Sequence, residues 1–363
     1  NKIYDMYEVK GTVRENDTAS LYGESSLRKG EVKIGDEVYV SENEEIPGLL
    51  GYSVKAYIID IDRADDKSVI YAYKDKKNEE LEISSEDIED ASKTLIEYTS
   101  GTKTLKAKLS KAADVVYNGL GKESYDATLL KPVYGGIKLI DNDGDGSYDV
   151  AFVTDYKLAV VSSTANTDKK IGIYDKYGND FEAETDIEKC NIFVWVKNEA
   201  ADIKEITSGS VVLIADSGLC GGSRVINIFI CSDKVTGVLK NVNDETITID
   251  SAVIDYSPLM NVSEIRSSAS KTVTCYKDIF GKAIYVTVGS EGNYGYLFKA
   301  ALLDDEVEEA VQVKILTTDN EWKTYRLKEK IRCNDKSWNS VDFYNESDLT
   351  KKTLDGVTGE ETV

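Results

Sequence analysis

The stretch IKLIDNDGDGSYDVAFV, residues 137–153, sets two apolar runs on either side of a short loop that carries four aspartates. Both runs have strand-like sequence, and the Asp, Asn and Gly residues between them are typical of tight turns. The stretch therefore predicts a β-hairpin. Its loop crowds the four carboxylates into residues 141–149 of a chain whose net charge is already −22, so their mutual repulsion needs a physical explanation.

Strand-like patterns recur along the whole chain. Apolar and polar residues alternate in five further segments, as they do in half-buried strands. These segments are GEVKIGDEVYV (30–40), VIYAY (69–73), ETITID (245–250), AIYVTV (283–288) and VQVKIL (311–316). The best helical candidates are short, at residues 85–95 and 105–115. We therefore expect an all-β fold of tandem small β-barrel or sandwich modules with few short helices.

Two parts of the chain repeat one pattern. VKGTV (9–13) and VTGVL (235–239) each precede a pair of strands and then a hairpin. The hairpin of residues 137–153 has the same style, which makes the turns at 60–68, 141–149 and 276–283 comparable. The pattern predicts a module used more than once.

We expect four domains along the chain. They are an N-terminal β module (1–92), a β module with the Asp-rich hairpin loop (93–180), a third β module (181–290) and a C-terminal β module (291–363) that could be truncated. No Pro-rich linker separates them, because the chain has only three prolines.

The aspartates of the loop have the spacing D-x-D-x-D-G-x-x-D. Calcium takes about six to eight hard oxygen ligands, and alternating carboxylates of a loop can surround one centre. Gly146 at the sixth position permits the reversal of the backbone. The predicted ligands of a structural Ca²⁺ ion are Asp141, Asp143, Asp145, the carbonyl of Ser147, and Asp149.

This loop differs from a helical EF-hand. Phe152 occupies the twelfth position, where an EF-hand has a bidentate Glu, and the flanks are strands. The loop is similar to the β-hairpin calcium loops of integrin-type propeller repeats and is related to the dockerin half-loop. Without the twelfth ligand we expect weak affinity, with a Kd of about 10⁻⁴ to 10⁻³ M. The alternative is an acidic, solvated turn.

Composition excludes several functions. The 66 Asp and Glu residues outnumber the 44 Lys and Arg residues, which argues against nucleic-acid binding and against an anionic membrane surface. No apolar run is long enough to span a membrane. Because the chain has no histidine, it cannot form a Ser-His-Asp triad or a Cys-His pair. Only carboxylate-pair or lysine chemistry remains, so we expect a non-enzymatic protein.

The cysteines and the glycine-rich segment predict no site. None of the five cysteines lies in a CxxC pair, and their odd number allows no self-contained disulfide framework. They are Cys190, Cys220, Cys231, Cys275 and Cys333. DSGLCGGSR (216–224) lacks the GK[ST] sequence of a phosphate loop, which favours a flexible hairpin tip.

Two tryptophans support an alternative function. Trp322 and Trp338 are predicted to lie in polar loops, where exposed rings could bind a glycan. The chain would then be an adhesin or a carbohydrate-binding module rather than a spacer.

Several phrases of the chain resemble the β-rich extracellular regions of Clostridia-type cell-surface proteins that carry S-layer homology domains. The phrases are VKGTV with GEVKIGDEVYV, LLGYSVKAYI (49–58), GGIKLIDNDGDGSYDVAFV (135–153), VTCYKDIFGKAIYV (273–286) and VQVKILTTDNEWKTYRLKEKI (311–331). The resemblance implies an extracellular, structural or spacer segment at the bacterial cell surface. Its partners would be a cell-wall polymer, or other copies through self-assembly, reached through flanking domains. No S-layer homology repeat is evident in the sequence itself.

Overall fold

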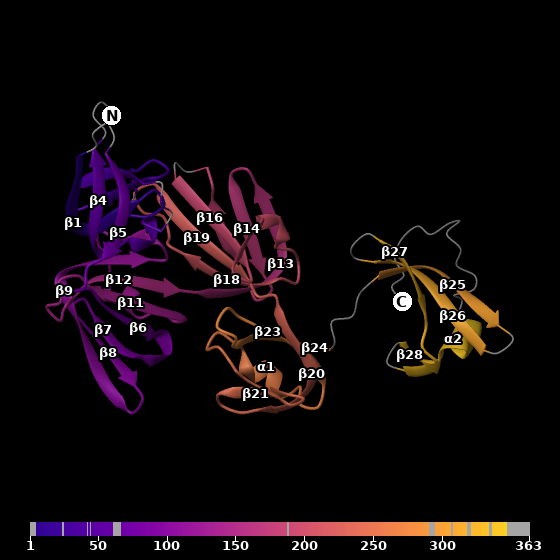
Figure 1. The fold of residues 1–363 in the computed structure, drawn as a ribbon. Coiled ribbons are helices and arrows are strands. Elements are labelled where there is room, and N and C mark those ends of the chain that lie inside the picture. The colour runs from indigo at the N-terminus through magenta and orange to yellow at the C-terminus, as the bar shows by residue number, and fades with distance from the viewer. Residues whose placement is uncertain are drawn as a thin grey trace. The chain divides into compact units, whose positions relative to one another are not determined.

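The computed structural model describes residues 5–23, 25–41, 43, 45–60, 67–186, 189–289, 295–305, 308–317, 321–333 and 336–346. The described residues form mostly β-strands with a few short helices (Figure 1), which confirms the predicted all-β class. The chain divides into two compact units, Asn1–Val288 and Gly289–Val363. The larger unit contains four β modules with related strand orders, of which module 1 is a closed barrel.

Module 1 (residues 5–74) is a closed five-stranded barrel with the order β1-β2-β3-β5-β4. All neighbouring strands are antiparallel except β3 and β5, which are parallel. This is the topology of an OB-type Greek-key barrel. The strands are β1 (Asp5–Asn16), β2 (Glu31–Ile34), β3 (Glu37–Ser41), β4 (Ser53–Asp60) and β5 (Ser68–Lys74).

Module 4 (residues 233–288) repeats this arrangement. Its sheet order is β22-β21-β20-β23-β24. A parallel bridge between Tyr256 and Ala283 joins the two ends of this sheet, at the place where β3 and β5 pair in module 1. The elements are β20 (Asp233–Val242), β21 (Thr246–Ile249), β22 (Ala252–Asp255), α1 (Val262–Arg266), β23 (Thr272–Lys277) and β24 (Ala283–Val288).

The strand registers of modules 1 and 4 agree, including two β-bulges. Val13 lies opposite Ile34 and Leu239 lies opposite Ile249, and a bulge follows each pair. A second bulge follows Tyr57 on β4, and another follows Tyr276 on β23. Bulges are specific features of a fold rather than accidents of it. The agreement confirms the repeat predicted from VKGTV and VTGVL.

The glycine of that repeated motif has a structural reason. A Cβ on Gly11 would lie 3.0 Å from the backbone nitrogen of Gly35, and a Cβ on Gly237 would collide with Asp250. Gly35 and Asp250 form the equivalent turns after β2 and β21, and both have positive φ angles. The first strand of modules 1 and 4 therefore crosses a turn closely, and glycine there avoids displacing a neighbour.

Module 2 (residues 79–155) has the same strand order in a longer form. Strands β6 and β7, which the 3-10 helix η2 (Ser85–Asp87) separates, together take the place of the first strand: β6 pairs with β11 and β7 pairs with β8. The one parallel pair is β9 with β12. The strands are β6 (Glu79–Ser84), β7 (Ile88–Ser92), β8 (Leu95–Ser100), β9 (Lys103–Tyr117), β10 (Leu120–Gly121), β11 (Gly135–Asp141) and β12 (Tyr148–Asp155).

Module 3 (residues 157–230) has a related strand order, but its first strand, β13, is continuous, and β15 and β16 share the third position. Its parallel pair is β16 with β19, where Val196 lies opposite Ile230, as Tyr117 lies opposite Val153 in module 2. Equivalent two-residue turns with positive φ follow Tyr117 and Val196. The strands are β13 (Lys157–Thr167), β14 (Lys170–Asp175), β15 (Phe181–Glu184), β16 (Lys189–Val196), β17 (Glu199–Ala201), β18 (Val211–Asp216) and β19 (Ser223–Ile230).

The continuous apolar runs of β11 and β12 result from burial on both faces. Leu139 and Ala151 belong to the core of module 2, whereas Ile140 and Val150 belong to the core of module 1. Successive side chains of a strand point to opposite faces, so a strand between two cores needs apolar residues at every position. Strands β18 and β19 repeat this, because their second face contributes to a core shared by modules 2, 3 and 4.

Both helix predictions are wrong. Residues 85–95 contain η2 and strand β7, and residues 105–115 lie within β9. Ala107 and Leu109 on β9 are buried while Lys106 and Lys108 are exposed. That alternation is the period of a strand, and cross-strand pairing with β8 decides it.

The predicted domain boundaries fall inside sheets. The boundary after residue 92 lies between β7 and β8, and the boundary after residue 180 lies between β14 and β15. The boundary after residue 290 lies close to the division between the two compact units. Whether the predicted segments fold independently stays a prediction.

The smaller unit contains a three-stranded sheet in the order β25-β26-β27 and a separate hairpin of β28 and β29. Val311 and Val313 on its middle strand, β26, are buried. The elements are β25 (Gly295–Asp305), β26 (Glu308–Thr317), β27 (Trp322–Arg326), β28 (Lys330–Cys333), β29 (Lys336–Asn339) and α2 (Ser340–Glu346).

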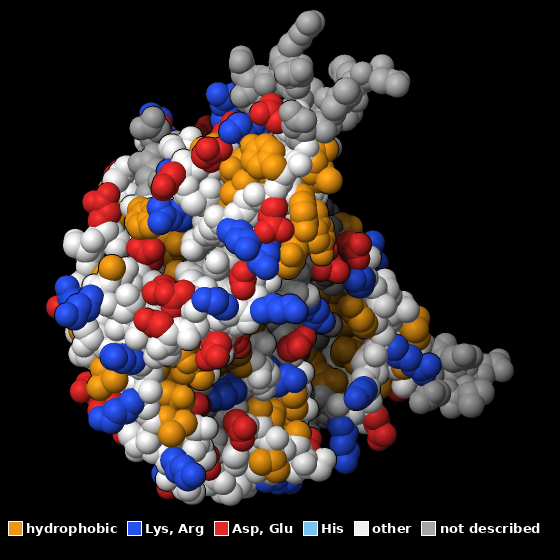
Figure 2. All heavy atoms as spheres, turned by 60° about the vertical axis from the view of Figure 1, so that its left-hand side comes forward, with side chains coloured by type: hydrophobic (Ala, Val, Ile, Leu, Met, Phe, Trp, Pro, Cys, Tyr) orange, Lys and Arg blue, Asp and Glu red, His pale blue; other side chains and the backbone are white. Residues whose placement is uncertain are grey.

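Charged side chains of both signs are spread over the face that Figure 2 shows. Basic side chains lie among acidic ones there, without an extended basic patch. Among the described residues, no helix combines the length and apolar character that a membrane crossing requires.

Candidate metal centre

The Asp-rich loop connects β11 and β12, as the sequence predicts. Ile140 and Val150 form the last strand pair before the loop, and Asp141 is the final residue of β11. Asp141 is only 1% exposed, whereas Asp143 is exposed and Asp149 is half-buried. The loop thus begins with a buried carboxylate at the edge of a packed hairpin.

Three of the predicted ligands converge. One carboxylate oxygen from each of Asp141, Asp143 and Asp149 lies within 4.8 Å of the other two. Such a group could hold a metal ion, and its donors are hard oxygens without sulfur or imidazole. That donor set suits Ca²⁺, Mg²⁺ or Mn²⁺ better than zinc.

The loop backbone wraps around the carboxylate of Asp141. Its Oδ1 accepts hydrogen bonds from the N–H groups of Asp143 (3.1 Å) and Gly144 (2.7 Å), and its Oδ2 accepts one from Gly146 (2.8 Å). Burial alone would raise the pKa of Asp141, but these N–H groups outweigh it and hold that pKa below its ordinary value. These N–H groups therefore stabilise the ionised form of Asp141.

Two acids near the loop, Asp149 and Asp114, have raised pKa values. Burial raises the pKa of Asp149; the N–H of Asn142 opposes this, and the carboxylates of Asp143 and Asp141 add to it. The pKa of Asp114 on β9 is raised to about 6, chiefly by burial and in part by Asp149. Asp114 is an acid of this neighbourhood that the loop sequence alone did not indicate.

Asp145 and Ser147 lie outside the group of three. The Oδ1 of Asp145 accepts the N–H of Ser147 at 2.7 Å, and Asp143 in turn accepts the N–H of Asp145 at 3.1 Å. Their assignment as ligands stays a prediction. Phe152, at the twelfth position, instead packs next to Gly51 of module 1, where a Cβ would come within 2.8 Å of its ring.

The loop is attached to module 1. The Oδ1 of Asn142 accepts the N–H of Ser53, the first residue of β4, at 3.0 Å. The N–H of Asn142 donates to Asp149 at 2.9 Å. Asn78, between the two modules, also bonds to both backbone groups of Ser53. Any ion held by Asp149 would therefore act close to the junction of modules 1 and 2.

The equivalent loop of module 3 replaces the acids with an arginine. Asp216 is the final residue of β18, as Asp141 is of β11. The residue before each aspartate occupies the same place in its sheet: Ala215 lies opposite Asn227, and Ile140 lies opposite Val150. The Oδ1 of Asp216 accepts hydrogen bonds from the N–H of Gly218 and from Nε of Arg224, each at 2.9 Å, and its Oδ2 accepts one from Nη2 of Arg224 at 2.7 Å.

This equivalence escaped the sequence analysis. DSGLCGGSR was predicted to be a hairpin tip and does connect β18 and β19, but nothing in it matches the Asp array of residues 141–149. Burial opposes ionisation of Asp216, yet the hydrogen bonds from Arg224 outweigh it and lower the pKa of Asp216. In module 3, the guanidinium of Arg224 thus supplies the positive charge beside the loop aspartate.

The corresponding turn of module 4 has neither the carboxylate group of module 2 nor the aspartate–arginine pair of module 3 among its described residues. Asp278 is buried, and its Oδ1 accepts the N–H groups of Phe280 (2.9 Å) and Lys282 (3.0 Å), while its Oδ2 accepts the hydroxyl of Tyr134. In module 1, residues 61–66 of the comparable turn lie outside the described part of the chain.

The remaining candidates lie elsewhere. Trp322 begins β27 and is 51% exposed, with its ring edge-on to Phe298 at 4.8 Å. Trp338 lies on β29, half-buried against Phe343. The prediction that both tryptophans lie in loops is therefore wrong, because strand pairing includes them in β27 and β29. The four cysteines whose side chains are described are free thiols, and burial raises the pKa of Cys231 and of Cys275 to about 12.

Comparisons with protein-family models, with curated protein sequences and with solved structures gave no match to this chain. Its function therefore has to be inferred from its own residues. The repeated modules and the carboxylate group of the β11–β12 loop are the features available for that inference.

Proposed function

We propose that this chain is a non-enzymatic structural segment of a bacterial cell-surface protein, a spacer of tandem barrels stabilised by Ca²⁺ at the β11–β12 loop. The convergence of Asp141, Asp143 and Asp149 carries the proposal. In this role the modules supply length and rigidity, and the ion stabilises one of the hairpins that join them.

Electrostatics supports a structural ion. Three carboxylates within 4.8 Å repel one another when charged, and a divalent cation would reverse that repulsion. Mg²⁺ prefers few carboxylates and retains several waters, so Ca²⁺ suits this loop better. The arginine that neutralises Asp216 in module 3 supports the view that this turn benefits from a cation.

Location at the cell surface follows from the sequence resemblance. The partners would be a cell-wall polymer, or neighbouring copies, contacted through flanking domains. Antibody labelling of intact cells that express the natural protein would test the location: labelling only after lysis would contradict it.

Thermal unfolding in chelator and in Ca²⁺ tests the ion. We expect the melting temperature to rise in Ca²⁺, to rise less in Mg²⁺, and to lose its response in Asp149→Asn. Asp168→Asn, which removes one charge from an exposed turn of module 3, should respond like the wild type. An unchanged melting temperature together with no heat in a calorimetric Ca²⁺ titration would exclude the proposal.

A second candidate function is glycan binding by the smaller unit. The exposed ring of Trp322 beside Phe298 is the observation that favours it, since exposed aromatic faces are frequent binding groups. Binding of the intact chain to a glycan array, lost in Trp322→Ala, would support this function over that of a pure spacer.

A further inference from the structure

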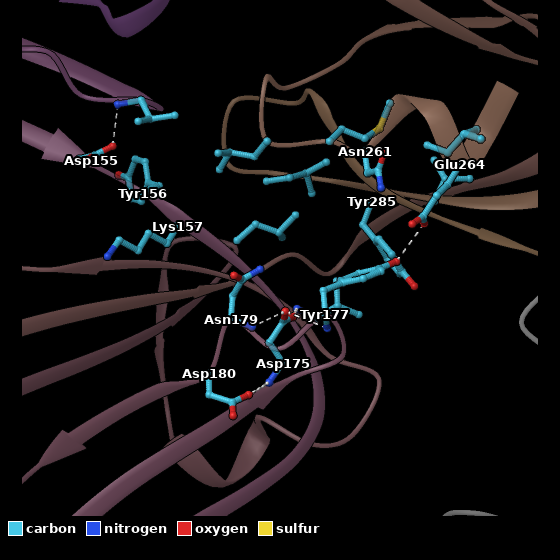
Figure 3. A pocket seen from close by; sticks show the side chains of 18 residues that line it. Asp155, Tyr156, Lys157, Asp175, Tyr177, Asn179, Asp180, Asn261, Glu264 and Tyr285 are labelled. Atoms are coloured by element: carbon cyan, nitrogen blue, oxygen red, sulfur yellow. Dashed lines mark hydrogen bonds between the residues drawn. The ribbon is translucent and has the colours of Figure 1, made fainter.

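A cleft of about 710 Å³ lies between modules 3 and 4 in the larger unit. Figure 3 shows its walls: the turn after β14 on one side, and Tyr285 of β24 with the start of α1 on the other. Its volume is within the range of small-molecule sites, about 300–1,000 Å³. No residue of the β11–β12 loop lines it, so this site does not depend on the proposed calcium ion.

The floor of the cleft is apolar. It is formed by buried residues of β13, of the segment before α1, and of β24, which are Val160, Met260, Ile284 and Val286. These side chains also belong to or adjoin the cores of the two modules. A floor supported by two cores is fixed in shape before any ligand arrives.

Two of the carboxylates in the walls are structural. Asp175 is buried and accepts the N–H groups of Val160 (2.7 Å), Tyr177 (3.0 Å) and Asn179 (3.2 Å). Asp155 likewise accepts the backbone N–H groups of Val133 and Tyr134 and the hydroxyl of Tyr117. The bonds of Asp175 fix the turn after β14 that presents Tyr177 and Asn179 to the cleft.

Other polar groups remain available to a ligand. Within the described residues, the amide side chain of Asn179 and the Nδ2 of Asn261 make no hydrogen bond. One carboxylate oxygen of Asp180 and one of Glu264 are free of hydrogen bonds in the same sense. The cleft therefore offers both donors and acceptors beside an apolar floor, as a ligand with many hydroxyl groups requires.

Two tyrosine rings form one wall. Tyr177 is 46% exposed, and its hydroxyl lies 3.4 Å from the Oε2 of Glu264. Burial, the hydroxyl of Tyr285 and the carboxylate of Glu264 raise the pKa of Tyr177, so its phenol stays neutral. The ring supplies an apolar face with a polar end.

The charges around the cleft disfavour ionic ligands. Four lining carboxylates outnumber two lysines, Lys157 in the lining and Lys176 beside the tyrosine wall, which disfavours an anion. A cation is disfavoured at the tyrosine wall, because the ammonium of Lys176 already lies 5.7 Å from the ring centre of Tyr177 and 6.0 Å from that of Tyr285. A neutral ligand avoids both penalties.

We propose that the cleft between modules 3 and 4 binds a neutral saccharide, with a sugar ring against Tyr177 and hydroxyl groups on Asn179, Asn261, Asp180 and Glu264. The site is separate from Trp322 in the smaller unit. It would add recognition to a segment whose proposed role is structural.

Saturation-transfer NMR on the intact chain tests this, with cellobiose, maltose, chitobiose and mannobiose as separate neutral probes. We expect transfer to at least one disaccharide and a loss of affinity of about tenfold in Tyr177→Ala. Tyr71→Ala, the same change at an exposed tyrosine of module 1, and Trp322→Ala should bind like the wild type. Asn179→Ala, an exposed substitution that leaves the backbone bonds of the turn intact, should weaken binding without changing the melting temperature.

Three outcomes would overturn the proposal. The first is no transfer to any of the four disaccharides, and the second is unchanged affinity in both Tyr177→Ala and Asn179→Ala. The third is loss of binding in Trp322→Ala alone, which would place the sugar in the smaller unit. The calcium proposal is tested by thermal unfolding and the saccharide proposal by NMR. A negative result for one therefore does not affect the test of the other.

Discussion

The hairpins β11–β12 and β18–β19 occupy the same place in modules 2 and 3, with the same register, yet they close in different ways. Each begins its loop with an aspartate that accepts the backbone N–H two residues later. Asp141 then meets two further carboxylates, whereas Asp216 meets both nitrogens of one edge of the Arg224 guanidinium.

The difference shows that the negative charge of such a turn can be neutralised by a side chain of the protein or by a cation from solution. The ion pair in module 3 is largely shielded, with side-chain exposures of 17% for Arg224 and 21% for Asp216. Its strength therefore depends little on dissolved ions. The β11–β12 loop has no such partner among its own residues, so its stability should depend on the cations in the medium.

The largest expected effect comes from removing the internal cation. Arg224→Ala leaves Asp216 buried without its partner, which should cost about 2–3 kcal/mol of unfolding free energy in urea titrations, somewhat less than for a fully buried pair. Added Ca²⁺ should not restore this loss. The double variant Arg224→Ala with Asp216→Ala should recover part of it, and a double variant less stable than Arg224→Ala would contradict the explanation.

The calcium response of the wild type comes next. At a Ca²⁺ concentration some ten to a hundred times Kd, we expect a gain of roughly 1.4–2.7 kcal/mol over chelator. Arg224→Ala should show the same gain, because its loop is not the one that binds. Differential scanning calorimetry of both proteins measures this, and a gain confined to the wild type would show that the two loops are coupled.

The pH dependence of the ion pair should be smaller. Because its folded pKa is lowered, Asp216 contributes stability above its ordinary pKa and loses that contribution as the pH falls through the folded pKa. The stability difference between the wild type and Arg224→Ala should therefore narrow between about pH 5 and pH 2. Urea unfolding across this range measures it; a difference that widens on acidification would refute the assignment.

The smallest expected effect comes from moving the arginine. Val150 and Asn227 are equivalent positions in the two sheets. Ser147 and Arg224 each lie three residues before them, so Ser147 is the counterpart of Arg224. Ser147→Arg should stabilise the chelated protein by about 0.5–1 kcal/mol and reduce its calcium response. Ser147→Gln, of similar length without charge, is the control and should leave the calcium response unchanged.

Local sequence predicted the parts of this fold that depend on neighbouring residues. The hairpin of residues 137–153 followed from two strand-like runs around turn residues. The repeat of VKGTV and VTGVL was recognisable from a shared glycine, and Gly11 and Gly237 each pass close to an equivalent turn. Residues 105–115 were mistaken for a helix because the pairing partner that makes them a strand, β8, is not visible in their own composition.

The candidate site could be predicted in part. Asp141 and Asp143 are close in sequence, and Asp149 joins them because β11 and β12 form the predicted hairpin. The separate position of Asp145 depends on how the loop closes around Asp141, which the spacing does not specify. The acid Asp114 comes from β9, which reaches this neighbourhood only by pairing with β12.

The sequence by itself therefore determined an all-β chain, a repeated module and a hairpin loop with calcium-type spacing, because alternation, turn chemistry and carboxylate spacing act over a few residues. Only the tertiary structure decided that Asp216 and Arg224 are the counterpart of the Asp loop. It also assembled the cleft from residues as distant as Asp155 and Val286. The physical reason is that strand register and module packing depend on hydrogen bonds and apolar contacts between segments far apart in the chain.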